Sequence, residues 1–180
     1  MPDTEIEILV LGLSESGKSA LLKRIKEYRG GKAEVADEIH DSVVFLPPTV
    51  GMEYEMLAGV KKGKASWRVR EVGSSLRQVW HRFYEHANKV IYVLDMSNIV
   101  SLGSATVAFS RLLSEEMLSG KPILLLLNKM DCEYSLSKTE VLTRMRIDWY
   151  SSRGSGSRLT IMESSLLFGS IESIVNWMVV

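Results

Sequence analysis

The chain has 180 residues, which is enough for one domain with a large buried core. Lysine plus arginine (22) equals aspartate plus glutamate (22), so the net charge of zero gives no support to a nucleic-acid-binding or anionic-membrane surface. The lone cysteine, Cys132, excludes an internal disulfide and suits a reducing compartment. With no membrane-spanning apolar run and no signal-peptide pattern, we expect one cytoplasmic domain over residues 1–180.

The segment Gly12–Ser19 reads Gly-Leu-Ser-Glu-Ser-Gly-Lys-Ser and matches the phosphate-loop pattern. The apolar run Ile6–Leu11 before it predicts a buried strand, and helical spacing from about Ser19 to Arg29 predicts a helix. In such a loop, backbone N–H groups turn around an anion, the ammonium of Lys18 lies between the β- and γ-phosphates, and the Ser19 hydroxyl binds Mg²⁺. The alternative is a glycine-rich turn that precedes a lysine by chance. The predicted phosphate-binding residues are Ser14, Glu15, Ser16, Gly17, Lys18 and Ser19.

A polar stretch, Gly30–Ser42, follows the first predicted helix and is expected to be a loop. Pro47 and Pro48 then impose an extended approach to Thr49. Two strand-like runs, Met52–Val60 and Ser66–Val72, flank a Lys-Lys-Gly-Lys turn, so we predict a hairpin.

The rest of the chain alternates helical and strand-like runs. Ser137 with Glu140 three residues later predicts a capping box at the start of one of the helices. Strands that are apolar throughout and alternate with helices imply a mainly parallel sheet covered on both faces, with ligands bound at the carboxyl ends of its strands. We expect strands at Val90–Leu94, Ile123–Leu127 and Leu159–Met162, and helices from Leu76 to Tyr84, Leu102 to Leu118, Val141 to Ile147 and Ile171 to Met178. The expected core positions of the second of these helices are Leu102, Val107, Phe109, Leu112 and Leu113.

A second motif, Asn128-Lys129-Met130-Asp131, comes directly after a predicted buried strand. The carboxylate of Asp131 can accept hydrogen bonds from guanine N1–H and the 2-amino group, which adenine does not supply. Asn128 would tie the base edge to nearby loops, and the stem of Lys129 would cover the ring. The segment Glu163-Ser164-Ser165-Leu166, after the last strand, is expected to offer backbone N–H groups to the base oxygen, with Ser164 and Ser165 as its site residues. The alternative is a polar turn after a strand, but together with Gly12–Ser19 the motif predicts a guanine-nucleotide site.

With these motifs the chain resembles a small GTPase of the Arf-like (ADP-ribosylation-factor-like) family over about Ile6–Met178. The resemblance rests on Gly12–Ser19, Pro48–Gly51, Val79–Tyr84 with Val90–Asp95, and Asn128–Asp131. It implies an α/β fold, the P-loop NTPase three-layer sandwich, with a mainly parallel six-stranded sheet, one antiparallel edge hairpin and about five helices. It also implies a GTP/GDP-dependent switch in vesicle or ciliary traffic, with protein effectors, an exchange factor and a GTPase-activating protein as partners. Thr49 matches the threonine that reaches Mg²⁺ and the γ-phosphate.

One segment departs from the family, because Arg70-Glu71-Val72-Gly73-Ser74-Ser75 stands where Arf proteins read Trp-Asp-Val-Gly-Gly-Gln. Glu71 replaces the aspartate that holds Mg²⁺ through water, so the resemblance gives Ser19, Thr49 and Glu71 as the metal site, with altered geometry. In three features the chain resembles the divergent branch that contains ADP-ribosylation factor-like protein 16. These are Glu71, the absence of the glutamine at position 75, and the long segment that precedes Thr49.

The catalytic residues implied by the resemblance are Gly73, Ser74 and Ser75. Ser75 replaces the glutamine that orients the attacking water and is too short to act in the same way, so we predict slow GTP hydrolysis. Gln78 and His81 follow about one helical turn later and would have to reach inward to substitute for it. We expect both of them to be surface residues.

The chain ends carry none of the family's usual lipid anchors. Pro2 stands where Arf proteins carry the myristoylated glycine, Pro2–Glu5 is too short for their amphipathic helix, and Asn176–Val180 contains no cysteine for prenylation. We therefore expect a monomer without a direct membrane anchor that visits membranes or cilia through partners.

Three functional hypotheses remain open. The first is the GTP/GDP switch just described. The second is a scaffold that binds GTP constitutively and does not cycle, which Glu71, Ser74 and Ser75 favour. The third is a P-loop kinase of small molecules, which Asn128–Asp131 disfavours because that motif specifies a base.

Overall fold

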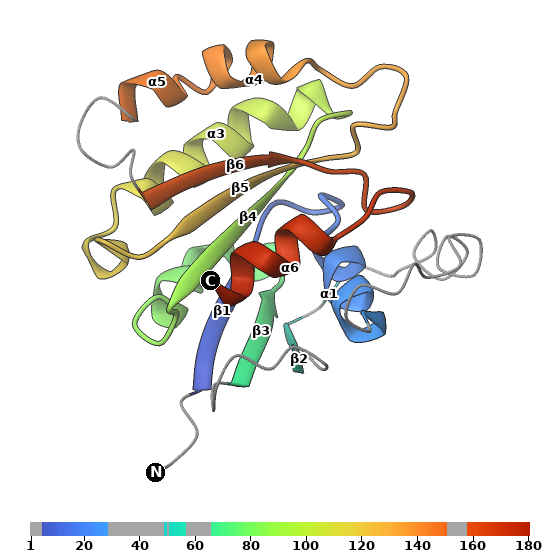
Figure 1. Cartoon of the computed structure of the whole chain (residues 1–180). Coiled ribbons are helices and arrows are strands. Elements are labelled where there is room, and N and C mark those ends of the chain that lie inside the picture. Colours follow the sequence, from blue (N-terminus) through green and yellow to red (C-terminus); the bar gives the residue numbers. More distant parts are fainter. Residues whose placement is uncertain (1–4, 29–48, 50, 57–65, 151–157) are drawn as a thin grey trace.

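The computed structural model describes residues 5–28, 49, 51–56, 66–150 and 158–180, and it has a six-stranded sheet at its centre (Figure 1). The strand order is β2-β3-β1-β4-β5-β6; β2 runs antiparallel to β3, and all other neighbouring strands are parallel. The predicted sheet is thereby confirmed. The strands are β1 Glu5–Leu11, β2 Met52–Met56, β3 Ser66–Val72, β4 Lys89–Asp95, β5 Ile123–Asn128 and β6 Leu159–Glu163.

Helices cover both faces of this sheet, as its apolar strands require. In Figure 1, α3, α4 and α5 lie on one side of the sheet, and α1 and α6 lie on the other. The α-helices of the described part are α1 Lys18–Glu27, α3 Ile99–Leu113, α4 Lys138–Arg144, α5 Ile147–Tyr150 and α6 Glu172–Val179. Two 3-10 helices, η1 Ser74–Phe83 and η2 Glu116–Leu118, complete the set.

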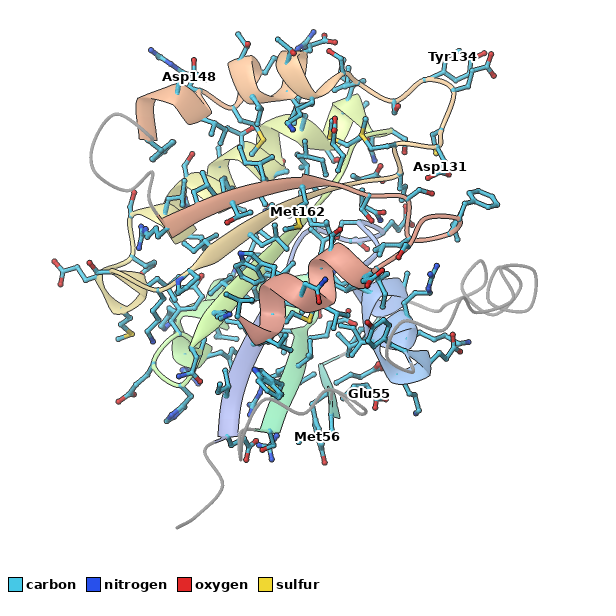
Figure 2. The ribbon with its side chains drawn as sticks, viewed as in Figure 1. Glu55, Met56, Asp131, Tyr134, Asp148 and Met162 are labelled. Carbon is cyan, nitrogen blue, oxygen red and sulfur yellow. The ribbon has the colours of Figure 1, made fainter. Side chains whose placement is uncertain are left out.

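The core divides into two layers because successive strand residues point to opposite faces. On β1, Leu9 and Leu11 pack with the residues of α3 and α4, whereas Ile8 and Val10 pack with those of α1 and α6. Met162 of β6, labelled in Figure 2, contacts the second layer. The strands β4 and β5 are apolar on both faces apart from their end residues, and β1 is apolar and buried from Ile8 to Leu11. These buried strands support the loops that follow their carboxyl ends.

Two local predictions are confirmed in detail, and one needs qualification. The Ser137 side chain accepts a hydrogen bond from the Glu140 N–H at 3.2 Å and begins α4, as its capping pattern indicated. The helix expected from Ile171 to Met178 is α6, displaced by one residue at each end, and Met178 is fully buried. The helical run after Gly73 is a 3-10 helix with a kink at Leu76 rather than a regular α-helix.

The prediction for α3 was partly wrong. The helix begins at Ile99, because the Asn98 side chain caps it by accepting from the Ser101 N–H, and it ends at Leu113 rather than Leu118. The expected core position Val107 is 53% exposed, because α3 presents that side to solvent while Phe109 and Leu112 face the sheet.

Several expected features lie outside the described residues: the loop Gly30–Ser42, Pro47, Pro48, and the second half of the hairpin's first strand with its turn. Among the described residues, β2 spans Met52–Met56 and pairs with β3 so that Met52 lies opposite Val72. No helix in this part of the chain is long and apolar enough to cross a membrane.

Candidate functional site

A cavity of about 480 Å³ opens where β1, β3 and β5 end and β6 is followed by its loop. Residues from five separate segments of the chain line it, which is the arrangement that a parallel sheet produces at its carboxyl edge. The lining residues are Ser14, Glu15, Gly17, Lys18, Ser19, Ala20, Thr49, Glu71, Gly73, Ser74, Asn128, Lys129, Asp131, Cys132, Leu166 and Leu167.

The two glycines of Gly12–Ser19 allow a close approach that a side chain would prevent. A Cβ atom on Gly12 would lie 2.4 Å from the Val93 carbonyl oxygen, and one on Gly17 would lie 2.2 Å from Asn128 Nδ2. Gly17 also has a φ of 102°, which favours glycine. Ser16 is buried rather than lining the cavity, and its carbonyl accepts a hydrogen bond from Asn128 Nδ2 at 2.9 Å.

Lys18 is a buried cation at the first position of α1. Its Nζ donates to the Leu13 carbonyl at 2.8 Å, across the loop. Burial lowers the pKa of the Lys18 ammonium, and the nearby Glu71 carboxylate opposes that shift. A bound anion would favour the charged form of Lys18, and the N-terminus of α1 adds its positive dipole end.

Ser19, Thr49 and Glu71 form a cluster of oxygen ligands on the cavity wall. Ser19 Oγ lies 2.9 Å from Thr49 Oγ1 and donates to Glu71 Oε1 at 3.0 Å. The second carboxylate oxygen, Glu71 Oε2, is buried without a hydrogen-bond partner in the described part. Burial raises the pKa of Glu71, while hydrogen bonds from Ser19 and Thr49 and the charge of Lys18 lower it. This set of hydroxyl and carboxylate oxygens fits a hard divalent cation such as Mg²⁺.

The expected catalytic residues begin at the end of β3. Gly73 donates its N–H to the Gly51 carbonyl at 2.9 Å, and a Cβ there would lie 2.6 Å from the Thr49 carbonyl oxygen. Ser74 lines the cavity, but Ser75 is exposed and does not. Gln78 and His81 are both exposed, as expected of surface residues.

On the opposite wall, the side chains of the Asn128–Asp131 motif hold it in place through hydrogen bonds to other segments. Asn128 is 3% exposed, and its Oδ1 accepts from the Leu166 N–H at 3.1 Å. Lys129 has a φ of 67° and donates through Nζ to Asp95 Oδ2 at 2.7 Å. Asp131 is exposed and lines the cavity; Figure 2 shows it in the loop that follows β5.

The loop after β6 differs in detail from the prediction. The Ser164 N–H donates to the Leu127 carbonyl at 2.8 Å, so it is engaged within the protein. Leu166 and Leu167, rather than Ser164 or Ser165, line the cavity. Leu166 belongs to the segment expected at the base, whereas sequence reasoning missed Leu167 and Cys132, because a leucine in a loop looks like a core residue until the strand ends are placed.

Comparisons with known proteins identify the family of the chain. The model of the ADP-ribosylation factor family matches residues 1–179. The chain belongs to the ADP-ribosylation factor family. Among its relatives, ADP-ribosylation factor-related protein 1 is 30% identical in Homo sapiens and 31% in Rattus norvegicus, each over 179 residues that cover 96% of this chain and 82% of the relative. ADP-ribosylation factor-like protein 3 of Caenorhabditis elegans is 27% identical over 83% of this chain and 74% of that protein.

A solved small GTPase has the same fold. The Arl6 BBS3 small GTPase of Trypanosoma brucei, with the bound nucleotide analogue GppNp, gives a TM-score of 0.72 at 20% identity, covering 97% of this chain and 95% of that one. The fold class inferred from the motifs is therefore confirmed.

Proposed function

We propose that this member of the ADP-ribosylation factor family is a GTP/GDP-dependent switch that recruits protein effectors. One observation carries the proposal: the phosphate loop and the Asn128–Asp131 motif, more than 100 positions apart in the sequence, line one cavity of about 480 Å³. A cavity of that size is in the range of small-molecule sites, and its lining combines residues expected at phosphates with residues expected at a base.

In this proposal, each wall of the cavity recognises one part of the nucleotide. Ser14 to Ser19 surround the phosphates with backbone N–H groups and the Lys18 ammonium. Asp131 accepts the hydrogen bonds of the guanine edge, and the stem of Lys129 covers the ring. Thr49 and Gly73 come from segments that GTP would order, which gives an effector a surface to read.

The oxygen cluster of Ser19, Thr49 and Glu71 is the proposed Mg²⁺ site. When bound, Mg²⁺ neutralises charge on the β- and γ-phosphates. Glu71 Oε1 accepts a hydrogen bond from Ser19 Oγ at 3.0 Å. The other carboxylate oxygen, Oε2, has no hydrogen-bond partner in the described part and is available to a cation. The longer arm of glutamate therefore keeps the negative charge of the usual aspartate at the cluster.

Slow hydrolysis is part of the proposal. Ser75 stands where the family has its glutamine, and its exposed side chain lies off the cavity. Together with Glu71, this favours a place in the divergent branch of ADP-ribosylation factor-like protein 16. We place the protein in the cytoplasm, in vesicle or ciliary traffic, as a monomer that meets an exchange factor, a GTPase-activating protein and effectors.

The same position of Ser75 favours a second candidate, a scaffold that holds GTP without turnover. The two candidates differ in whether the bound nucleotide ever changes.

Calorimetry with GTP, GDP and ATP, each with Mg²⁺, tests the proposal, followed by phosphate release over hours. A switch binds both guanine nucleotides, excludes ATP and releases phosphate slowly. Binding of GTP without release supports the scaffold. No heat with either guanine nucleotide, on folded protein freed of bound ligand, contradicts both.

A further inference from the structure

Arg24 is a buried cation on α1 that holds a loop from the far end of the chain. It is 7% exposed, and it donates through Nη1 to the Leu166 carbonyl at 3.0 Å and through Nη2 to the Gly169 carbonyl at 2.9 Å. It forms no ion pair with a carboxylate among the described residues. Burying a guanidinium without a counter-charge is unfavourable, so the two carbonyls are its compensating partners.

The loop between β6 and α6 takes its shape from these bonds. The carbonyl of Leu166 is bound by Arg24, and its N–H is bound by Asn128 Oδ1, so both polar groups of this residue are fixed. The turn is closed by the Gly169 N–H, which donates to the Ser165 carbonyl at 2.6 Å. Figure 1 shows the start of α6, just after this loop, beside α1.

The hydrogen bonds of Asn128 and Arg24 form a closed network that connects the phosphate loop, α1 and the loop at Leu166. Asn128 donates to the Ser16 carbonyl in the phosphate loop, that loop leads directly into α1, and α1 carries Arg24 back to Leu166. Because a helix is stiff, the distance between the phosphate loop and the loop at Leu166 is set by one rigid element.

We propose that Arg24 is a positioning residue for base recognition, which sets the dwell time of the nucleotide by holding Leu166 and Leu167 against the base end of the cavity. The inference rests on the proposed guanine-nucleotide site. Arg24 itself does not line the cavity, so it acts only through the loop.

The chain offers a matched control in Arg158. This arginine also donates to two backbone carbonyls, those of Leu113 and Leu118, and it does not line the cavity. Replacing either arginine removes the same kind of contact, but only Arg24 contacts the loop at Leu166.

The experiment compares the full chain with Arg24→Gln, Arg24→Lys and Arg158→Gln. Release of fluorescent GDP and of a non-hydrolysable GTP analogue is measured by stopped flow, with amide hydrogen exchange of the segment 164–169 and thermal melting in parallel. Loss of the charge-assisted bonds in Arg24→Gln should speed release about tenfold or more. The factor should be equal for the two nucleotides, because they share the base and differ only at the γ-phosphate. Arg24→Lys has donors on one nitrogen only, so its release rate should lie between those of wild type and Arg24→Gln. Amide hydrogen exchange of residues 164–169 should be faster in both Arg24 variants than in wild type.

Four results would overturn the proposal. One is release from Arg24→Gln that matches wild type while the melting temperature falls as in Arg158→Gln, which is a purely structural role. Another is faster release of the GTP analogue alone, which places the effect at the phosphates. If Arg24→Gln does not fold, Arg24→Lys decides, and unchanged release and exchange in that variant reject the idea. If wild-type protein binds no guanine nucleotide, that result contradicts the proposed function itself, and the inference about Arg24 fails with it.

Discussion

Asn128 and Ser16 lie 112 positions apart in the sequence, yet the Asn128 side-chain amide donates to the Ser16 carbonyl at 2.9 Å. The other end of the same amide accepts from the Leu166 N–H. One buried side chain therefore connects three loops that line or support the cavity.

Asn128→Asp should destabilise the protein and weaken guanine-nucleotide binding. The change is nearly isosteric, but it places an oxygen against the Ser16 carbonyl and buries a carboxylate that keeps only the hydrogen bond from the Leu166 N–H. The free energy of unfolding should fall by about 2–3 kcal/mol. Urea unfolding and nucleotide calorimetry measure the two effects, and Asn176→Asp on the exposed side of α6 is the control. Equal stability of the two variants would contradict the role of Asn128.

Gly17→Ala should abolish most nucleotide binding. The new Cβ would lie 2.2 Å from Asn128 Nδ2, at a φ of 102° that alanine rarely adopts. We expect affinity to drop at least about 100-fold as the phosphate loop shifts. Gly103→Ala is the control, since nothing lies within 4 Å of its Cβ and it sits inside α3. That variant should bind normally and gain about 0.5–1 kcal/mol of stability. Normal affinity in Gly17→Ala would show that the loop does not need its close approach.

Stability without nucleotide and Mg²⁺ should depend on pH through Glu71. Burial raises the folded-state pKa of this carboxyl above its ordinary value of 4.5. Between those two values the folded protein binds more protons than the unfolded chain, so stability falls as the pH rises through that window. Relative to Glu71→Gln, which does not titrate, wild type should lose free energy of unfolding as the pH increases above 4.5. Urea unfolding at a series of pH values tests this, with Glu71→Asp as a variant that still titrates. A difference that stays constant with pH would mean that burial does not control this group.

Ser75→Gln should speed hydrolysis of bound GTP. The side chain is exposed on η1, so the substitution leaves the core intact, and a glutamine is long enough to orient water. We expect the single-turnover rate to rise at least about tenfold. Gln78→Ala, at another exposed position of η1, should leave the rate unchanged. Wild-type hydrolysis as fast as in a glutamine-bearing Arf protein would refute the prediction, and so would no gain in Ser75→Gln.

The sequence predicted the parts of the fold that depend on local pattern. Gly12–Ser19 lies between a strand and a helix because the apolar run before it and the helical spacing after it leave few alternatives. Ser137 begins α4 because a side-chain cap acts within three residues. The core strands followed from their continuous apolar runs.

The errors came from effects that short sequence windows do not contain. Val107 has the composition of a core residue, but the direction in which α3 faces the sheet decides its exposure. The ends of α3 depend on the Asn98 cap and on the break before η2. Leu167 and Arg24 acquire their positions from contacts with segments far away in the chain, so the place of Leu167 in the cavity and the bonds of Arg24 to the loop at Leu166 were visible only in three dimensions.

The lining of the cavity begins at Ser14 and ends at Leu167, so it draws on almost the whole length of the chain. During translation, β1 and the phosphate loop leave the ribosome before β6, so the wall of the cavity at Leu166 forms only after β6 has been made. A chain cut short before Leu166 has the phosphate loop but lacks that wall of the cavity. Occupancy by a ligand that needs both walls would therefore report that synthesis has passed Leu167.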